Sequence, residues 1–596
     1  MSVKSAELID FPAAKTKPMT ARPEAMVELP ADNKKLVDTA LDIIGICRND
    51  AGSRASYYRT LNQIVETGKA DGSRSIINLL YRMLDRLSSL LFSPAEIKFS
   101  MDFENEYTDD ILARGGVVSR LMSKSWERSS TDLLFAQGVF ESLKYGAAVL
   151  KQWPSQQGEN RLPFYHSSLV MPWQFGVYRP DSADLDSQPA MTETVMLTLP
   201  EVWRRIWHMP DARQLFDRIK QHSASGNQTE IANSFFHQVL STSPINTSGI
   251  ASAPRPGGIV QVSNAGNNTG FVPDSGAPMV MMHELWMWDQ SDYVTIQIIE
   301  PDILIAPRYR RSNLLAAGMD SCLHPYTLIQ CNQAHGNIWG RSELADLIEP
   351  QDFLSTTASD IRRLFGVQVD KILAFTGDGL TDEAYDQMRA AGYANLGPGG
   401  GVNDLTPKFP PEALAMIDKI IQIMEMIGGF DNLLSGRGET GVRSGVQSSP
   451  LMKTAGAPVK DRSLIIERQC AQAAQLRFEL MKIKDGRTFW TDKKKPGETS
   501  FLLGDIPEDG RIVVDGHTTS PVFADENLGL LTNGVKMGVV DPVSYIEQAP
   551  FQQKDVLIAR LQAKEEKQAA MLAELRKSDP EEWAKVIEKA AVGHKK

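Results

Sequence analysis

Two segments in the second half of the chain carry apolar residues at helical spacing. The first spans 341–365 and is expected to begin at Ser342, whose side chain can cap a helix, and to kink or restart at Pro350. Its apolar stripe consists of Leu354, Ala358, Ile361 and Phe365. The pattern predicts an amphipathic helix that packs along one side.

The second segment, 411–430, is apolar around most of its circumference. Its apolar residues include Leu414, Met416, Ile417, Ile420, Ile421, Ile423, Met424 and Ile427. Asp418, Gln422 and Glu425 lie four and three residues apart, so they share one face of the helix. Such a strip is usually the solvated face of an amphipathic helix. The wide apolar cover favours a helix with neighbours on several sides and water on that strip alone.

The residues between and after these helices predict a small inserted unit, a loop and a long helix. The insert, 366–410, is expected to contain a strand at 367–375, a helix at 382–391 and a returning strand at 400–405. The loop, 431–446, is rich in glycine. A long helical region is expected over 447–485.

The remaining regions predict a mixture of helices and strands. Residues 1–32 predict a flexible tail, 33–340 a mixed region, 486–520 strands and 521–596 helices. Within the mixed region, helices are expected at 36–44, 75–91, 109–144 with a break at Gly115–Gly116, and 200–220. Strands are expected at 96–101, after Gly146, and at 170–178, 279–305 and 326–330. The stretch 222–278 is dominated by Ser, Asn, Gly, Thr and Pro and predicts a disordered insertion or flap. The fold class is therefore α+β and mostly helical.

Composition narrows the class of protein. The chain has 596 residues, a formal net charge of -11, and no apolar run long enough to span a membrane. We therefore expect no membrane partner. An acidic balance disfavours a protein that clamps nucleic acid tightly, because such proteins are usually basic. A conduit through which DNA slides has the opposite need, since strong phosphate contacts would hold the strand.

The cysteines and histidines predict no metal site. Cys47, Cys322, Cys331 and Cys470 form no CxxC pair, which argues against a disulfide scaffold and suits a reducing compartment. His324 and His335 lie near Cys322 and Cys331, but the spacing matches no zinc-finger pattern. Two reduced thiols in a loop are the simpler interpretation.

Glycine clusters provide no convincing nucleotide site. Gly436–Gly441 matches GxGxxG, but a helix precedes it where the dinucleotide fold needs a strand. Gly397–Gly401 could hold a phosphate through backbone amides, although such runs are usually turns. No GxxxxGK[ST] and no GxSxG occurs, so the sequence predicts neither a Walker ATPase nor a serine hydrolase. We expect no enzymatic activity and no cofactor.

The order of helix, insert, helix, loop and long helix resembles the core of tailed-bacteriophage portal proteins. The residues that carry the resemblance are Trp339–Leu344, Pro411–Leu414 and Arg443–Val446, with the prolines and helix that follow. The resemblance implies a ring of identical subunits, usually about twelve, at one capsid vertex. It assigns 33–340 and 486–520 to a wing, 341–365 and 411–430 to stem helices, 366–410 to a clip, 431–446 to a tunnel loop, 447–485 to a kinked helix that crosses the wing, and 521–596 to a helical crown.

The resemblance also implies roles for individual residues and partners. Arg437, Glu439 and Arg443 would line the tunnel, Asp418, Gln422 and Glu425 would face the channel from the stem, and Asp378, Asp382, Glu383 and Asp386 would form the docking surface of the clip. The expected partners are other copies of the chain, double-stranded DNA, the terminase large subunit, major capsid and scaffold proteins, and tail adaptors. The protein would be assembled in the host cytoplasm and reside in the virion.

Two other classes stay open. One is a different ring-forming virion or scaffold protein, which would lack a channel of duplex width. The other is an enzyme with no recognisable motif, which would need a pocket with converging residues of shifted pKa. The insertion 222–278 is not required by the portal pattern and leaves the outline of the wing open.

Overall fold

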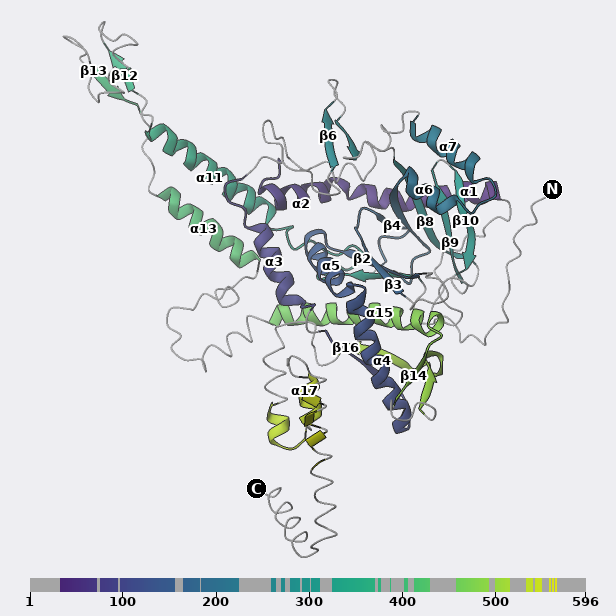
Figure 1. The fold of residues 1–596 in the computed structure, drawn as a ribbon. Coiled ribbons are helices and arrows are strands. Elements are labelled where there is room, and N and C mark those ends of the chain that lie inside the picture. Colours follow the sequence, from purple (N-terminus) through teal and green to yellow (C-terminus); the bar gives the residue numbers. More distant parts are fainter. Residues whose placement is uncertain are drawn as a thin grey trace, which may run out of the picture.

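The computed structural model describes most of the chain between Asn33 and Gln548. The described residues are 33–71, 75–94, 97–155, 164–182, 184–224, 259–263, 269–273, 279–289, 292–300, 302–310, 324–369, 373–376, 386, 401–405, 412–428, 457–491, 499–514, 532–539, 542–548 and seven positions within 557–567. They form an α+β structure in which helix exceeds strand, as the sequence predicts. Figure 1 shows a body of packed helices and sheets and an arm that projects from it.

Two antiparallel sheets form the centre of the body. The larger sheet has the strand order β10-β9-β8-β5-β4, and the smaller has the order β11-β2-β3. The strands of the larger sheet are β4 (Phe175–Val177), β5 (Ala190–Thr198), β8 (Met279–Asp289), β9 (Asp292–Ile299) and β10 (Ile303–Arg310). Those of the smaller sheet are β2 (Ala148–Ser155), β3 (Phe164–Val170) and β11 (Tyr326–Ile329). The predicted strands at 279–305 and 326–330 are confirmed.

Three helices pack on the larger sheet, on the parts of its surface that the smaller sheet leaves open. Helix α1 (Asn33–Ser53) packs on one face through Leu36, Ala40, Ile43 and Cys47, against Leu285, Val294 and Ile296 among others. Gly176 allows this contact, because a Cβ there would lie 2.2 Å from the carbonyl oxygen of Cys47. Helices α6 (Leu199–Ile206) and α7 (Ala212–Ala224) cover the end of the sheet formed by Val280, Met282, Ile299 and Ile303.

The single helix predicted over 200–220 is therefore wrong, since α6 and α7 are separated by a turn at 207–211. Pro210 explains the separation. It has no amide proton to donate, and it disfavours helical backbone at the residue before it.

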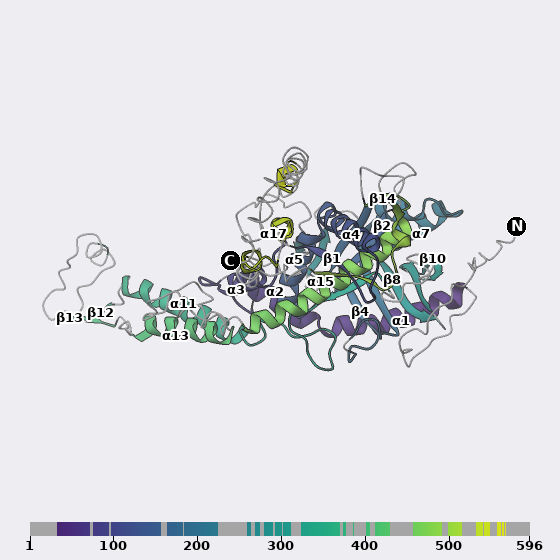
Figure 2. The same cartoon turned by 90° about the horizontal axis from the view of Figure 1, so that it is seen from below.

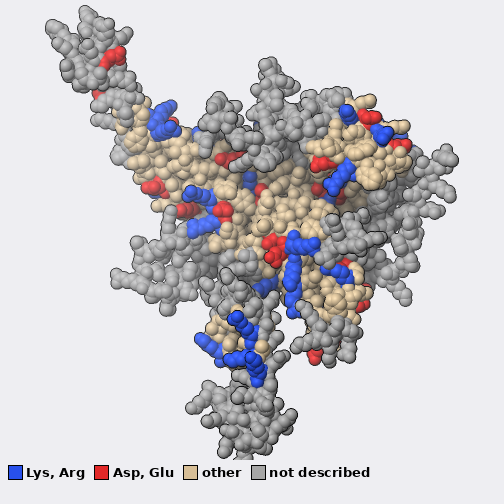
Figure 3. Space-filling model, viewed as in Figure 1, with Lys and Arg blue, Asp and Glu red and all other residues tan. Residues whose placement is uncertain are grey.

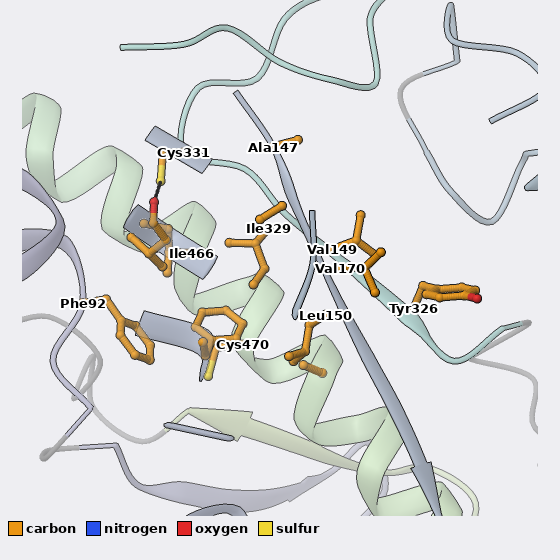
Figure 4. Packing of buried hydrophobic residues seen from close by; sticks show 14 of the residues in the cluster. Phe92, Ala147, Val149, Leu150, Val170, Tyr326, Ile329, Cys331, Ile466 and Cys470 are labelled. Carbon is orange, nitrogen blue, oxygen red and sulfur yellow. Dashed lines mark hydrogen bonds between the residues drawn. The ribbon is translucent and has the colours of Figure 1, made fainter. Parts of the chain in front are cut away.

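The smaller sheet is buried on both faces. One face meets the larger sheet, and the other meets α5 (Thr131–Tyr145) and α15 (Ala457–Lys484). Figure 4 shows Leu150, Ile329 and Ile466 between β2 and α15, whereas Val149, Val170 and Tyr326 lie on the other side of the sheet. Gly146 ends α5 with φ 100 and leads into β2, which confirms the predicted helix end followed by a strand. Helix α15 runs without a break from Ala457 to Lys484, so the predicted kink does not fall within it.

The glycine pair at 115–116 does not interrupt its helix. Helix α4 (Asp109–Arg128) passes through both residues, and the break lies at Ser129–Ser130, where Ser130 has φ 50. A Cβ at Gly115 would lie 3.0 Å from the ring of Phe103, at the end of β1 (Phe99–Phe103), while a Cβ at Gly116 would meet nothing within 4 Å. Gly115 therefore allows α4 to pack closely on β1. The partner of β1 is β16 (Gly510–Val514).

Shorter elements complete the body. They are α2 (Ala55–Thr67), α3 (Leu80–Leu91), β14 (Thr488–Trp490), β15 (Ser500–Leu502) and a 3-10 turn (Leu503–Asp505). Helix α17 (Pro542–Gln548) lies apart from the sheets, below α15 in Figure 1. Helix α3 begins five residues after the predicted start at Ser75. Strands β6 (Ile259–Ser263) and β7 (Thr269–Pro273) pair with each other, so this part of the stretch 222–278 is regular structure rather than a disordered insertion. The tail 1–32 and the loop 431–446 lie outside the described residues.

Two antiparallel helices form the arm. Helix α11 (Ile348–Val369) leads outward and α13 (Glu412–Ile427) returns, with β12 (Leu373–Thr376) and β13 (Gly401–Asp404) paired near the tip. Figures 1 and 2 show the arm extending away from the sheets in both views. The helix–insert–helix order predicted for 341–430 is therefore present in the fold.

The predicted limits of the first arm helix are wrong. Helix α11 begins at Ile348 rather than Ser342, so Pro350 lies in its first turn, where no amide donor is needed and no kink follows. The helix also continues to Val369, so 367–369 is helical and only 373–376 forms the expected strand. In the predicted helix 382–391, only Asp386 is described, and it is helical.

Candidate functional site

The arm is joined to the body by a buried polar contact at its root. The side chain of Gln351 donates from Nε2 to the carbonyl oxygen of Ile77 (2.8 Å), and its oxygen accepts from the amide of Leu79 (3.2 Å). Ser355, one turn further along α11, has its hydroxyl 2.7 Å from the carbonyl oxygen of Gly68. Both side chains are fully buried. Because these bonds are directional, they fix the angle at which α11 leaves the corner between α2 and α3.

Apolar contacts add to this joint. Leu354 of α11 and Ile420 and Met424 of α13 belong to the main hydrophobic core of the body. Ile417 and Ile421 pack against that core and are half-buried. The root is thus an extension of the core.

Helix α13 carries three strips along its length. The first, Ile417, Ile420, Ile421 and Met424, packs toward α11 and the core. The second is the predicted polar strip: Asp418 and Gln422 are exposed and Glu425 is half-buried. The third consists of large apolar side chains that remain exposed, and we call it the apolar strip: Met416, Ile423, Met426 and Ile427. At 100° per residue Met416, Ile423 and Ile427 lie within about 40° of one another, on the flank opposite Leu414 and Asp418. Met426 lies between these residues and Gln422, and the exposed Lys419 lies between Met426 and Ile423.

The exposure of the apolar strip is unusual for a folded surface. Met426 is 77% exposed, and Phe353 and Phe365 on α11 are also among the exposed large side chains. In Figure 3 most of the described surface of the arm is free of charged side chains. Where exposed apolar side chains form a contiguous patch, they mark an interaction site.

The structure places only some of the predicted site residues. Asp418, Gln422 and Glu425 share one face of α13, as predicted, and Asp386 is exposed in the insert. Arg437, Glu439 and Arg443 of the loop lie outside the described residues, as do Asp378, Asp382 and Glu383 of the insert.

Sequence reasoning missed a buried charged cluster between the two sheets. Lys151 of β2 places its Nζ 2.6 Å from Glu193 Oε2 and 2.7 Å from Glu284 Oε1. Tyr326 donates its hydroxyl to Glu193, and Trp286 donates its indole N–H to Glu284. Glu193 and Glu284 are paired across β5 and β8, so Lys151 binds both from the facing sheet. The cluster fixes how one sheet lies on the other.

Burial and the neighbouring charges shift the pKa values of this cluster in opposite directions. Burial alone would lower the pKa of Lys151, but the carboxylates of Glu284 and Glu193 outweigh it and raise that pKa. Burial likewise opposes ionisation of Glu284, and the lysine charge reverses the effect, so the pKa of Glu284 is lowered. Both groups are therefore held in their charged forms. A glutamate among strand-forming residues, as at Glu193 and Glu284, is the sequence signal that could have indicated the cluster.

A second buried cation was also missed. The guanidinium of Arg477 on α15 is fully buried and donates to Gln152, Thr131, Ser129, Ser167 and the carbonyl oxygen of Ser125. Burial lowers its pKa to about 9. Among the described residues no carboxylate is bonded to it, and its N–H groups donate to neutral acceptors that come from three other parts of the body. Arg477 holds α15 to the smaller sheet and to the α4–α5 junction.

Cys331 and His324, which the sequence spacing does not assign as zinc ligands, make other contacts. Cys331 is buried, lies 2.9 Å from the hydroxyl of Ser142, and has its pKa raised to about 12 by burial. His324 is buried with its Nε2 3.1 Å from Asp186. Cys322 lies outside the described residues. Among the residues that are described, no group of three or more His, Cys, Asp or Glu side chains could hold a metal ion.

Comparisons with known proteins add no relative. Neither the family models nor the curated proteins contain a match to this chain. Within the described part of the chain, no helix is both long enough and apolar enough to cross a membrane.

Proposed function

We propose that this chain is the subunit of a tailed-bacteriophage portal: a ring at one capsid vertex through which double-stranded DNA enters and leaves. The observation that supports this proposal is the arm. Its two antiparallel helices project from a mixed body, carry a strand pair at the tip, and expose an apolar strip beside a polar one. The order of these elements is the order on which the sequence resemblance rests.

The apolar strip requires a partner, and another copy of the chain is the simplest one. Covering exposed apolar area yields about 25 cal/mol per Å². In a ring, the strip of one copy would meet a different surface of the next copy. Contacts between different surfaces are heterologous, and they close into a ring when the rotation between copies allows it. Phe353 and Phe365 of α11 are exposed apolar side chains that a neighbouring copy could contact.

The polar strip gives the ring its channel. In a ring closed through the apolar strips, Asp418, Gln422 and Glu425 would face the axis and form negative bands. Such bands repel phosphates and keep DNA from binding to the wall. The tip, with Asp386 and the residues Asp378, Asp382 and Glu383, would dock the terminase motor and later the tail adaptors, while Arg437, Glu439 and Arg443 would contact DNA transiently.

Electron microscopy of the purified protein, with its mass measured in parallel, tests the ring. We expect closed rings of about twelve copies around a hole that admits duplex DNA. Rings without such a hole would favour a different ring-forming virion or scaffold protein. A chain that stays monomeric at high concentration and with scaffold protein present would contradict the proposal.

A matched pair of substitutions tests the surface itself. Ile423→Glu places a charge on the apolar strip and should abolish rings while the subunit stays folded, because the side chain is exposed in the free chain. Gln422→Glu adds the same charge to the polar strip of the same helix and should leave rings intact. Rings that survive Ile423→Glu would show that the strip is not the subunit contact.

Charge reversal tests the channel. Replacing Asp418 and Glu425 with lysine should leave ring assembly unchanged but slow or trap DNA during packaging, because cations on the wall bind phosphate. Deleting 436–441 should likewise permit assembly and impair packaging or retention of DNA. Normal genome filling in both variants would contradict the channel assignment.

A further inference from the structure

The surface between α6 and α7 contains a cleft that the ring does not use. It has a volume of about 480 Å³ and is lined by Leu199, Pro200 and Trp203 from α6 and by Arg213, Phe216 and Asp217 from α7. The rings of Trp203 and Phe216 meet edge to face with centroids 5.2 Å apart and form its floor. Trp203 nevertheless stays 38% exposed. The cleft is thus apolar below and charged along one rim.

The walls of the cleft are rigid. Val202 and Ile206 of α6 and Ile219 of α7 are fully buried against the larger sheet. Glu201 and Thr198 form a capping box at the start of α6, and Arg218 of α7 is paired with Asp302. The aromatic floor is therefore held in place before any ligand binds, which reduces the entropy lost on binding.

The segment that forms the cleft carries a net positive charge, whereas the chain as a whole is negatively charged. The segment 199–224 carries five Arg or Lys side chains and three Asp or Glu side chains, in a chain whose net charge is -11. Two of those three carboxylates, Asp211 and Asp217, lie on the α7 side of the cleft, and the third, Glu201, accepts the hydrogen bonds of the cap. Arg213 forms no ion pair with any carboxylate among the described residues, and Arg204 and Arg205 are exposed beside Trp203. Figure 3 shows basic and acidic side chains close together over α6 and α7.

We propose that this cleft is a docking site for a peptide segment of a partner protein, in which a large apolar side chain is flanked by acidic residues. The apolar side chain would contact Trp203 and Phe216, and a carboxylate beside it would pair with Arg213. An open groove between two helices suits a peptide better than a small metabolite, because metabolite sites enclose most of their ligand. Single-stranded nucleic acid fits less well, since the lining offers one cation, Arg213, to a backbone that carries a phosphate at every nucleotide. The site is independent of the apolar strip on α13 and of ring formation.

A selection from displayed random peptides of about twelve residues tests the proposal with the full chain. Binders are selected on the wild-type protein and depleted on the Arg213→Glu variant. We expect enriched peptides with one large apolar residue and neighbouring Asp or Glu. Synthetic copies should bind the wild type at least about tenfold more tightly than Arg213→Glu or Trp203→Ala, as expected for loss of a charge pair or an aromatic anchor.

Two controls isolate the cleft. Arg82→Glu changes the charge at an exposed position of α3, far from the cleft in the sequence. Trp207→Ala removes an exposed tryptophan at the end of α6 that does not line the cleft. Neither should change peptide affinity by more than about twofold. Replacing the acidic residues of a selected peptide by lysine should restore binding to Arg213→Glu, which a merely unfolded variant would not show.

Three outcomes would overturn the proposal. They are a selection that enriches nothing over the depletion step, enriched peptides without acidic residues, and binding of oligo(dT) in preference to the peptides. A change of oligomeric state in Arg213→Glu without any peptide binding would instead make the cleft a contact between copies, which also contradicts it.

Discussion

The body of the molecule encloses charged side chains between its sheets, whereas the arm leaves apolar side chains in solvent. Lys151, Glu193, Glu284 and Arg477 are all buried in the body, and each has partners for its charge or its N–H groups. On the arm, Ile423 and Met426 are exposed although polar residues would be expected there. The body also exposes large apolar side chains, such as Leu133 and Trp207, but its buried charges are all partnered within the chain. The exposed flank of the arm is the surface that we propose meets a neighbouring copy.

This comparison separates two kinds of stability. In the body, a substitution should be measured as a loss of free energy of unfolding, because its contacts lie within the chain. On the exposed flank of the arm, a substitution should leave the free energy of unfolding unchanged. Its effect should be seen only in the fraction of the protein that assembles into rings. The predictions below follow from this separation.

The largest loss is expected for Lys151→Met. Removing the cation leaves the carboxylates of Glu193 and Glu284 buried without a counter-charge, which destabilises by about 3–5 kcal/mol. Urea unfolding followed by tryptophan fluorescence measures the loss. The variant that combines Lys151→Met with Glu193→Gln and Glu284→Gln should recover at least half of it. A loss below about 0.5 kcal/mol for Lys151→Met would show that the cluster does not hold the sheets together.

Two methionines one half-turn apart on α13 test the boundary between body and arm. Met424 is fully buried and Met426 is 77% exposed. Met424→Ala should destabilise the chain by about 2–4 kcal/mol, whereas Met426→Ala should change its stability by less than about 0.5 kcal/mol. Assembly measured by mass should respond to Met426→Ala. Equal losses of stability in the free chain would contradict the packing of α13.

The glycine pair in α4 predicts two smaller effects of opposite sign. Gly116→Ala meets empty space and should stabilise the helix by about 0.5–1 kcal/mol, the difference in helix propensity. Gly115→Ala places a methyl group 3.0 Å from Phe103 and should cancel or reverse that gain, because α4 must move away from β1. Thermal unfolding compares the two variants. A larger gain for Gly115→Ala than for Gly116→Ala would show that the contact with Phe103 is loose.

The smallest effect is a dependence of stability on pH through His283. Burial lowers its pKa, while Glu300, 3.0 Å from its Nε2, partly opposes this, and Arg48 lies next to Glu300. The unfolded chain takes up the proton near the ordinary pKa of about 6.5, whereas the folded chain takes it up at lower pH. Stability should be complete above that pH and fall as the pH drops below it. The lowered pKa values of Glu300 and Glu284 act in the same direction at more acidic pH.

Melting temperatures between pH 7.5 and 5 measure this dependence. His283→Gln should make the fall shallower, because the titrating group is gone, whereas His208→Gln, at an exposed position of the α6–α7 turn, should not change it. A fall of the same steepness in His283→Gln would assign the effect to other groups.

Much of the arm could be predicted from the periodicity of the chain. The helices around Leu354 and Ile420, the insert between them and the shared face of Asp418, Gln422 and Glu425 all follow from spacing. The errors lie where a local signal had more than one structural meaning. Pro350 is compatible with a kink and with a first turn, and Gly115 with a break and with close packing on Phe103.

The sequence by itself determined the α+β class, the helix that ends at Gly146, the strands at 279–305 and 326–330 and the apolar character of α13, but it indicated neither β5 nor most of β3. Only the tertiary structure decided which apolar residues of α13 are buried and that Lys151 meets Glu193 and Glu284 across two sheets. The physical reason is range. Helical and strand periodicity depends on residues a few positions apart, whereas the partners of Lys151 lie 42 and 133 residues away. Contacts at such separations depend on how the elements pack, and local spacing carries little information about that packing.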